Sequence, residues 1–177
     1  ATQIAKRSGA EVYGTASPGK HARITELGVD HALDYTRQGW ERGLPKFDVI
    51  MDAVGGASFR RSYGLLRPGG RLVAFGASSV VSGERKNVVT ALRAVARMPR
   101  FNLIKQMSES KAVIGLNMLS LWKEHGTLEP WIGPMRELLA DGTVKPVVAG
   151  DFSFQHAGEA QTMIVERRNV GKVVLTP

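Results

Sequence analysis

Cysteine is absent from this chain of 177 residues, and histidine is scarce and scattered. Without cysteine, the chain forms no disulfide bond and offers no thiolate ligand to a metal ion. No two histidines follow the spacing of a metal-binding pair such as HxxxH; the four are His21, His31, His125 and His156. We therefore expect no metal site built from this chain alone.

The sequence also lacks a long apolar run and a start typical of a secretory leader. The longest apolar stretches are interrupted by charged residues, namely Lys105, Glu109 and Lys111, so none is expected to span a bilayer. A hydrophobic content of 43% is nevertheless enough for a packed core. These features predict a soluble, cytoplasmic protein with one domain, or with one domain and part of a second.

Acidic residues are few in the middle of the chain. Residues 60–111 hold eleven lysines and arginines against two acids, a net charge of +9, whereas the whole chain carries +8. Such an excess suits an anionic ligand, an acidic partner surface or a nucleic acid. Within it, residues 88–98 have the pattern of a basic amphipathic helix, with Arg93 and Arg97 opposite an apolar side. We expect this helix to pack on the domain surface, and peripheral contact with an anionic membrane is the alternative.

Strand and helix patterns alternate along the chain with short connections. Apolar runs predict strands at residues 11–16, 31–34, 47–52, 71–75, 111–116, 144–149 and 172–175. Helical patterns cover residues 1–8, 18–27, 55–66, 88–98, 131–140 and 155–167. The run at 47–52, FDVIMD, is typical of a parallel strand that is buried on both faces. The alternation predicts an α/β fold with an open parallel sheet.

One element of a nucleotide-binding α/β fold is missing from the sequence. A doubly wound fold begins with a central strand and a glycine-rich turn, but no GxGxxG occurs here and the first residues already have a helical pattern. Without that central strand, its two neighbours in the sheet would lack ladder partners. We therefore expect a Rossmann-type doubly wound parallel sheet that lacks its first strand and glycine-rich turn, in a fragment of a longer protein.

The segment 11–20, EVYGTASPGK, carries the strongest functional signal. It predicts a strand that ends at small hydroxyl residues and is followed by Lys20. The tip of the second strand of a dinucleotide-binding unit faces the adenosine ribose, where an acid favours NAD. Ser17 and Lys20 would instead donate hydrogen bonds and positive charge to a 2′-phosphate, which predicts NADP(H). The alternative is an ordinary turn, with Ser17 as a helix N-cap and Pro18 at the first helical position.

Seven segments occur in a familiar order: QIAKRSGAEVYGTAS, LGVDHALDY, FDVIMDAVGG, LLRPGGRLVAFGASS, VIGLNM, DGTVKP and RRNVGKVVLTP. Together they resemble the zinc-independent quinone oxidoreductase branch of the medium-chain dehydrogenase/reductase superfamily, and within it the vesicle amine transport protein homologues. The resemblance implies an N-terminal catalytic domain and an AxxGxG turn before the first residue of this chain. It also implies that residues 1–143 form the NADP-binding Rossmann domain and that residues 144–177 return to the catalytic domain.

The resemblance further implies which residues bind the cofactor. Around the 2′-phosphate and adenosine it places Ser17, Lys20, Tyr35 and Arg167. Along the ribose and nicotinamide it places Asp52, Val54, Gly55, Phe75, Gly76, Ala77, Ser78, Ile114, Gly115 and Leu116, and it adds Asn169 as a polar neighbour. Tyr35 as a strand-end aromatic and Arg167 as a helix-end cation are the structural alternatives. No residue is assigned as catalytic.

The function implied by the resemblance is an NADPH-dependent oxidoreductase that transfers hydride to quinones or α,β-unsaturated carbonyls. The isolated fragment is expected to be inactive. The partners are a small hydrophobic carbonyl or quinone substrate and a second copy of the chain, paired through the edge strand 111–116. Three alternatives stay open: a catalytically silent nucleotide-binding protein with a membrane-associated or regulatory role, a nucleic-acid-binding protein, and a methyltransferase.

Overall fold

The computed structural model describes residues 1–77 and 99–177; Ser78 and the expected helix 88–98 lie outside this range. Contacts divide the chain into two compact units. The first unit consists of Ala1–Trp40 and Glu129–Pro177, and the second unit is Glu41–Leu128. Among the described helices, none combines the length and the apolar character that crossing a bilayer requires.

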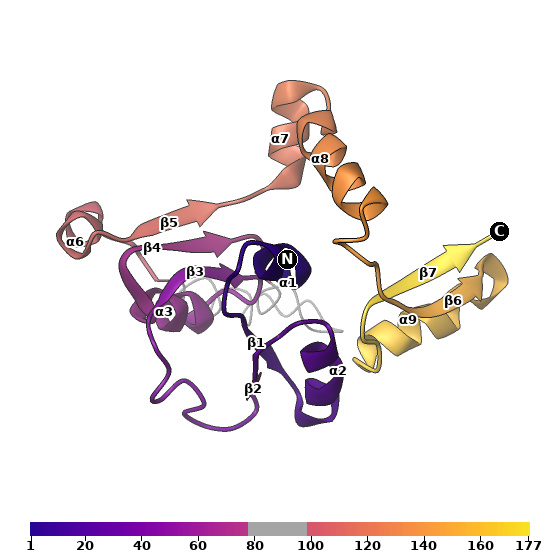
Figure 1. Ribbon diagram of the computed structural model, residues 1–177, viewed down its shortest axis with the longest axis horizontal. Coiled ribbons are helices and arrows are strands. Elements are labelled where there is room, and N and C mark those ends of the chain that lie inside the picture. Colours follow the sequence, from indigo (N-terminus) through magenta and orange to yellow (C-terminus); the bar gives the residue numbers. More distant parts are fainter. Residues whose placement is uncertain (78–98) are drawn as a thin grey trace, which may run out of the picture. The chain divides into compact units, whose positions relative to one another are not determined.

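The N-terminal part of the first unit is a helix followed by a βαβ arrangement. Its elements are α1 (Thr2–Arg7), β1 (Tyr13–Ala16), η1 (Pro18–Lys20), α2 (His21–Glu26) and β2 (His31–Asp34). Gly9 and Gly28 follow the ends of the two α-helices with φ of +73° and +98°, a left-handed conformation that favours glycine. β1 and β2 pair in parallel, with Ala16 opposite Asp34 (Figure 1). The carboxyl ends of both strands therefore lie at one edge of this sheet.

Side chains of α1 hold a loop from the far end of the sequence. The Gln3 amide accepts a hydrogen bond from the Lys145 backbone nitrogen at 3.0 Å and donates to its carbonyl at 3.3 Å. Arg7 donates to the Thr143 hydroxyl at 2.6 Å and pairs with the Asp141 carboxylate. Hydrogen bonds from Thr143, assisted by Arg7, lower the pKa of Asp141 to about 2. These contacts connect the two sequence segments of the first unit.

The C-terminal part of the first unit forms its own small sheet. Its elements are α8 (Glu129–Ala140), β6 (Val148–Ser153), η2 (Phe154–His156), α9 (Ala157–Val165) and β7 (Lys172–Thr176). β6 and β7 pair in parallel, and α9 contacts both strands. Ala160, in the middle of α9, is 4% exposed, so its methyl group marks the line along which the helix meets the sheet.

The expected strand at residues 144–149 is wrong in its position, because β6 begins only at Val148. Lys145 gives both of its backbone groups to a side chain of α1. Pro146 has no N–H to donate to a ladder. The segment before Val148 is therefore engaged in contacts that compete with strand pairing.

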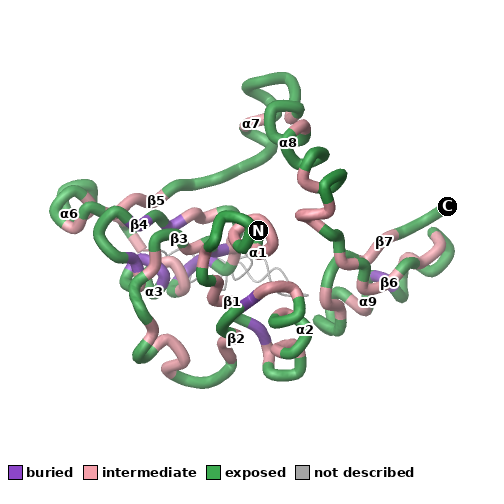
Figure 2. The backbone as a smooth tube through the Cα atoms, in the orientation of Figure 1, coloured by how far each residue is buried: buried purple, intermediate pink, exposed green. Residues whose placement is uncertain are grey.

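The second unit contains a three-stranded parallel sheet in the order β3-β4-β5 (Figure 1). Its elements are β3 (Phe47–Asp52), α3 (Ala57–Gly64), β4 (Leu66–Ala74), α6 (Leu103–Glu109), β5 (Ala112–Gly115) and α7 (Met118–His125). Buried residues of this unit gather in α3 and β4 (Figure 2), which contact each other. Tyr63, Leu66 and Leu72 form this core, with Phe101 packed against it. The Nζ atom of Lys111 lies over the Tyr63 ring, 5.0 Å from its centroid. This cation–π contact allows a charged group to pack beside the apolar core.

β4 starts earlier than its sequence pattern indicates. The sequence pattern predicts a strand only at 71–75, but pairing with β3 already begins at Leu66. The register then skips to Arg71, so the intervening residues form a bulge within the strand. Gly69 supplies the positive φ of +81°, and its nitrogen donates to the Ser110 carbonyl at 2.6 Å.

β3 differs from the expectation of a strand buried on both faces. Val49 is 53% exposed and Met51 is 52% exposed. In the described part of the chain, β3 pairs with β4 alone and lies at the edge of its sheet. A strand at the edge of a sheet is packed against fewer neighbours than a central strand. The apolar side chains of β3 therefore stay partly exposed, although its sequence is as apolar as that of a buried strand.

The strand orders confirm the predicted fold class. A doubly wound sheet with the order 3-2-1-4-5-6 has one pair of strands on one side of its first strand and three on the other. β2-β1 and β3-β4-β5 reproduce these two groups, all parallel. No strand within residues 1–77 and 99–177 joins the two sheets, in agreement with a Rossmann-type sheet that lacks its first strand.

Candidate functional site

The carboxyl ends of β1 and β2 bring three of the predicted residues together. Ala16 lies opposite Asp34, so Ser17 and Tyr35 continue from neighbouring strands at the same edge. Ser17 has an extended backbone, with φ −69° and ψ 150°, and its side chain makes no capping hydrogen bond to η1. Tyr35 is 43% exposed. Ser17 therefore occupies the N-cap position of η1, with Pro18 at its start, as the alternative interpretation predicted, although its side chain forms no capping bond. Neither side chain is buried in the sheet.

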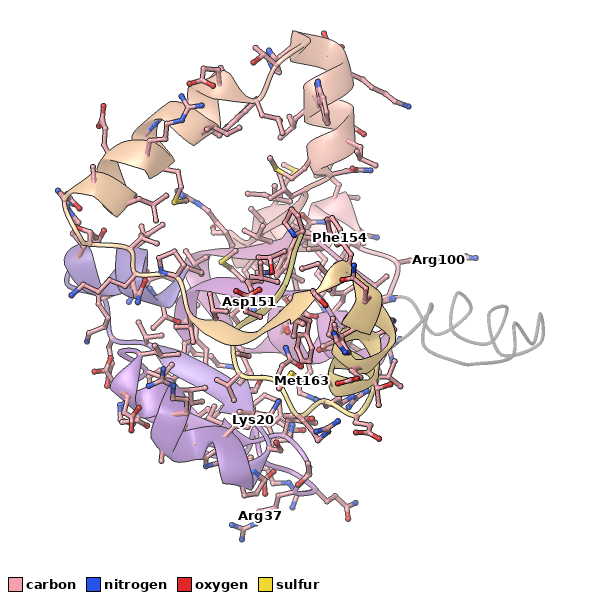
Figure 3. All side chains as sticks on the ribbon, turned by 90° about the vertical axis from the view of Figure 1, so that its right-hand side faces the viewer. Lys20, Arg37, Arg100, Asp151, Phe154 and Met163 are labelled. Carbon is pink, nitrogen blue, oxygen red and sulfur yellow. The ribbon has the colours of Figure 1, made fainter. Side chains whose placement is uncertain are left out.

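Lys20 is fixed by a contact with a distant part of the first unit. Its Nζ donates to the Asn169 carbonyl at 2.6 Å, in a partly buried setting. An ammonium group carries three N–H donors, so this bond orients the group while leaving donors for a further ligand. Figure 3 shows Lys20 at the boundary between the N-terminal ribbon and the C-terminal ribbon. The contact brings the turn after α9 to the end of β1.

Arg167 lies in that turn with an unusual backbone conformation. It follows α9 with φ +55°, and its nitrogen donates to the Ile164 carbonyl at 3.0 Å. Such a left-handed position at a helix end is usually glycine, and for other residues it costs about 1–2 kcal/mol. The Asn169 amide donates to the Gly171 carbonyl at 2.9 Å. The turn thus exposes the Arg167 side chain and directs the Asn169 carbonyl to Lys20.

In the second unit, predicted residues gather at the carboxyl edge of the β3-β4-β5 sheet. The Phe75 nitrogen donates to the Asp52 carbonyl at 3.1 Å, and the Leu116 nitrogen donates to the Ala74 carbonyl at 2.9 Å. The ladder thus continues past the strand ends. The edge presents half-exposed apolar side chains: Val54, Phe75, Ile114 and Leu116. The remaining predicted residues at this edge are Gly55, Gly76, Ala77 and Gly115.

The Asp52 side chain has an internal role. It is 5% exposed, and one carboxylate oxygen accepts hydrogen bonds from the nitrogens of Val54 at 2.8 Å and Gly55 at 3.3 Å. The other oxygen accepts from the hydroxyls of Ser58 and Ser62, both at 2.7 Å. Four donors from its own chain satisfy this carboxylate. Asp52 therefore holds the turn between β3 and α3 in place. Because its carboxylate is fully used by these bonds, a ligand at this edge would contact the backbone of the turn and not the Asp52 side chain.

Gly76 allows two strand ends to approach closely. A Cβ atom at this position would lie 3.0 Å from the Ala53 carbonyl oxygen and 3.3 Å from its Cβ. The neighbour is backbone and cannot move aside cheaply. The edge therefore stays narrow and free of a side chain at this point, which suits the close approach of a flat ligand to the backbone.

In the first unit, sequence reasoning missed Asp34 and Thr36, which lie on either side of Tyr35 in the chain. Asp34 Oδ1 accepts hydrogen bonds from the Thr36 hydroxyl at 2.6 Å and from the Thr36 nitrogen at 2.9 Å. These two bonds, with the nearby charges of His21 and Arg37, lower the pKa of Asp34. The Asp-x-Thr spacing, which is typical of an Asx turn, was the signal available in the sequence.

A hollow elsewhere in the first unit contains none of the predicted residues. It has a volume of about 480 Å³ and runs along α9, between Phe152, His156 and Arg168. Ligands of open α/β sheets bind outside the carboxyl ends of the strands. We therefore place the candidate site at the strand ends and not in this hollow.

Parallel strand order and helical crossovers define a Rossmann-type α/β protein. A family model described as zinc-binding dehydrogenase matches residues 27–175. The chain therefore belongs to this family, within the medium-chain dehydrogenase/reductase superfamily.

The relatives include vesicle proteins. The human synaptic vesicle membrane protein VAT-1 homolog is 30% identical over 174 residues, which cover 94% of this chain and 44% of that protein. The VAT-1 homolog of Danio rerio is 28% identical over 182 residues, covering 99% of this chain and 38% of that protein. The chain thus spans less than half the length of these relatives.

Solved structures agree with the fold. The quinone oxidoreductase from Thermus thermophilus, whose structure was solved with NADPH, matches with a TM-score of 0.72 and 27% identity, over 99% of this chain and 52% of that chain. An NAD-dependent alcohol dehydrogenase matches with a TM-score of 0.72 and 27% identity, over 99% and 46%. These neighbours support an oxidoreductase relationship and a nicotinamide cofactor.

The family description raises the question of a zinc site. Within residues 1–77 and 99–177, no group of three or more His, Cys, Asp or Glu side chains is arranged to hold a metal ion, and the chain has no cysteine. The donors described here do not fit zinc. We therefore assign no step to zinc.

Proposed function

We propose that this chain is the cofactor-binding part of an NADPH-dependent reductase that transfers hydride to quinones or α,β-unsaturated carbonyls. The observation that carries the proposal is Lys20, whose ammonium is held at the end of β1 by the Asn169 carbonyl, 2.6 Å away. An acid at this strand tip would select NAD, whereas this chain has Ser17 there. A fixed cation beside a hydroxyl is suited to a phosphate.

In this proposal the first unit receives the phosphorylated adenosine. Ser17 and Lys20 donate hydrogen bonds to the 2′-phosphate, and Arg167 adds a second positive charge from the turn after α9. Tyr35 covers the adenosine from the end of β2. The left-handed backbone of Arg167, φ +55°, supports this role, because strained residues that persist are often functional.

The strand ends of the second unit receive the nicotinamide in this proposal. The cofactor, when bound, supplies the hydride. The chain binds and orients the ring by its backbone at Gly76 and Gly115, and apolar side chains such as Phe75 and Ile114 exclude water. Positioning of donor and acceptor is the main contribution of such a site. The test is turnover by the intact protein with a panel of quinones and enones, comparing oxidation of NADPH with that of NADH; a preference for NADH, or no oxidation of either, contradicts the proposal.

A second candidate function is a nucleotide-binding protein without catalytic activity. The observation that favours it is that the relatives matched over most of this chain are named as synaptic vesicle membrane proteins, without a stated activity. The same assay separates the two functions. Tight binding of NADPH with no oxidation across the whole panel would support the silent protein.

We also propose that two copies of the chain pair through β5. In the described part of the chain, this strand pairs with β4 alone and lies at the edge of its sheet. An open edge is a template for strand addition. Sedimentation of the intact protein at micromolar concentration should give the mass of a dimer, and a monomer at all concentrations would contradict the proposal.

A further inference from the structure

Asp34 places a carboxylate at the edge where the proposed 2′-phosphate site lies. It is the last residue of β2 and lies opposite Ala16, the last residue of β1. Neighbouring strands are about 4.8 Å apart, so Asp34 is one strand away from the position where an acid selects NAD. A carboxylate here acts against a phosphate by charge repulsion.

Thr36 restrains this carboxylate. Its hydroxyl donates to Asp34 Oδ1 at 2.6 Å and its nitrogen donates to the same oxygen at 2.9 Å. Both bonds close a short turn around Tyr35, so they fix the carboxylate toward the loop that follows the strand. A group held in this way is less able to rotate toward a ligand at the end of β1.

Two basic residues near Asp34 add smaller contributions to those of Thr36 in lowering its pKa. His21 follows Lys20 in the chain, and its Nε2 lies 3.1 Å from the Ala16 carbonyl, beside the strand end. Arg37 follows Thr36, and Figure 3 shows its side chain extending outward from the ribbon. Both groups attract the Asp34 carboxylate. Its negative charge is thus engaged by Thr36, His21 and Arg37.

We propose that Asp34 is a specificity-determining residue, and that Thr36 holds its carboxylate back so that the site at the end of β1 accepts a phosphorylated ribose. This inference rests on the proposed use of NADPH. It assigns Asp34 a repulsive effect on the phosphorylated cofactor and Thr36 a positioning effect. The residual repulsion makes the preference for NADPH smaller than Lys20 and Ser17 alone would give.

The experiment measures the dissociation constants of NADPH and NADH for the intact protein and for matched variants. Asp34→Asn keeps an amide oxygen that can accept both Thr36 bonds but removes the charge. NADPH should bind about fivefold more tightly to this variant, as expected for a unit charge a few ångströms away in a water-like medium. NADH should change by less than about twofold. The control is Asp48→Asn, an exposed acid of the second unit, which should change neither constant.

Thr36→Val removes the hydroxyl bond and leaves only the backbone N–H of residue 36 to restrain the Asp34 carboxylate, which becomes freer to rotate. NADPH should bind about threefold to tenfold more weakly to this variant, while NADH stays the same or binds more tightly. Thr36→Ser keeps the hydroxyl and should behave as the wild type. Because the effect is electrostatic, the gain in Asp34→Asn should shrink at high salt, which a purely structural role would not do.

Two outcomes separate this inference from the proposed function. If Lys20→Ala lowers NADPH affinity but the NADPH-to-NADH ratio is unaffected in both Asp34→Asn and Thr36→Val, the inference is wrong and the proposed cofactor stands. If wild-type protein shows no preference for NADPH and Lys20→Ala changes nothing, the proposed cofactor itself is wrong. Equal weakening of both cofactors in Asp34→Asn would assign Asp34 a structural role only and would also overturn the inference.

Discussion

Asp52 provides a direct test of how the turn between β3 and α3 is held. Replacing it with alanine removes a 5% exposed carboxylate that accepts hydrogen bonds from two backbone nitrogens and from two hydroxyls, those of Ser58 and Ser62. The alanine side chain offers none of these donors an acceptor. We therefore expect a large loss of stability that is confined to folding and needs no ligand to be observed.

The magnitude follows from the number and kind of bonds. A hydrogen bond to a charged group contributes about 1.5–3 kcal/mol, and a buried donor left without an acceptor costs about 1–3 kcal/mol. Asp52→Ala, which takes the acceptor from four donors, should therefore lower the free energy of unfolding by about 3–5 kcal/mol. Ser62→Ala removes one bond and should cost about 1.5–3 kcal/mol. For a chain of this size, the larger loss lowers Tm by about 6–20 °C.

The assay is urea denaturation followed by circular dichroism, with thermal melting as a second measurement. The matched control is Asp48→Asn, whose side chain is 66% exposed and pairs with Arg67 at the surface; it should cost less than about 1 kcal/mol. A loss below about 1 kcal/mol in Asp52→Ala, or one equal to that of the control, would show that the four hydrogen bonds do not hold this turn.

Three further predictions concern pH, backbone strain and close packing. Hydrogen bonds from Thr143 lower the pKa of Asp141 to about 2, so the stability that they add is present above pH 4 and is lost as the pH falls to about 2. The Tm values of wild type and Asp141→Asn should therefore differ at pH 7 and converge at pH 2. A difference in Tm that persists at pH 2 would disprove this. Arg167→Gly should relieve the strain of φ +55° and stabilise the protein by about 0.5–1 kcal/mol while weakening NADPH; a tighter NADPH complex would exclude Arg167 from the site. Gly76→Ala should lower the free energy of unfolding by about 1–3 kcal/mol in urea denaturation, because the added Cβ would lie 3.0 Å from the Ala53 carbonyl oxygen. An unchanged urea midpoint would mean that the ends of β3 and β4 can move apart to make room for it.

Elements bounded by strong local signals could be predicted from the sequence. The strands His31–Asp34 and Phe47–Asp52 have the predicted bounds, because short apolar runs between turn residues leave little freedom in where a strand ends. α1 ends before Gly9, as its left-handed φ requires. Local chemistry was sufficient in each case.

Two helices, Leu103–Glu109 and Met118–His125, were not predicted. Both helices are short, with seven and eight residues, so their patterns are weak, and several of their apolar residues are highly exposed. The signal that could have located them is the N-cap. The Asn102 side chain accepts hydrogen bonds from the nitrogens of Ile104 and Lys105, and the Asn117 side chain accepts from Leu119, a use of asparagine that favours helix starts.

The candidate site shows where sequence reasoning stops. The order of strands in the sequence suggested that Ser17 and Tyr35 lie at the same edge of the sheet. The register of β1 and β2 agrees, because Ala16 lies opposite Asp34. The bond from Lys20 to the Asn169 carbonyl joins residues far apart in the sequence, and no local pattern encodes it. The Asp52 carboxylate has the residue type of a ligand contact, yet its burial and four internal bonds depend on the path of α3. Such roles emerge only from tertiary structure.

Lys20 is proposed to bind the 2′-phosphate of NADPH and thereby to select this cofactor over NADH. The most direct measurement is calorimetric titration of the intact protein with NADPH and NADH, in the wild type, in Lys20→Ala and in Lys46→Ala. Lys46 is a matched control, because its Nζ also donates to a backbone carbonyl, that of Gly64. Lys20→Ala should weaken NADPH by about 1–3 kcal/mol and leave NADH nearly unchanged, while Lys46→Ala affects neither. Equal losses for both cofactors in Lys20→Ala, or no loss at all, would contradict the claim.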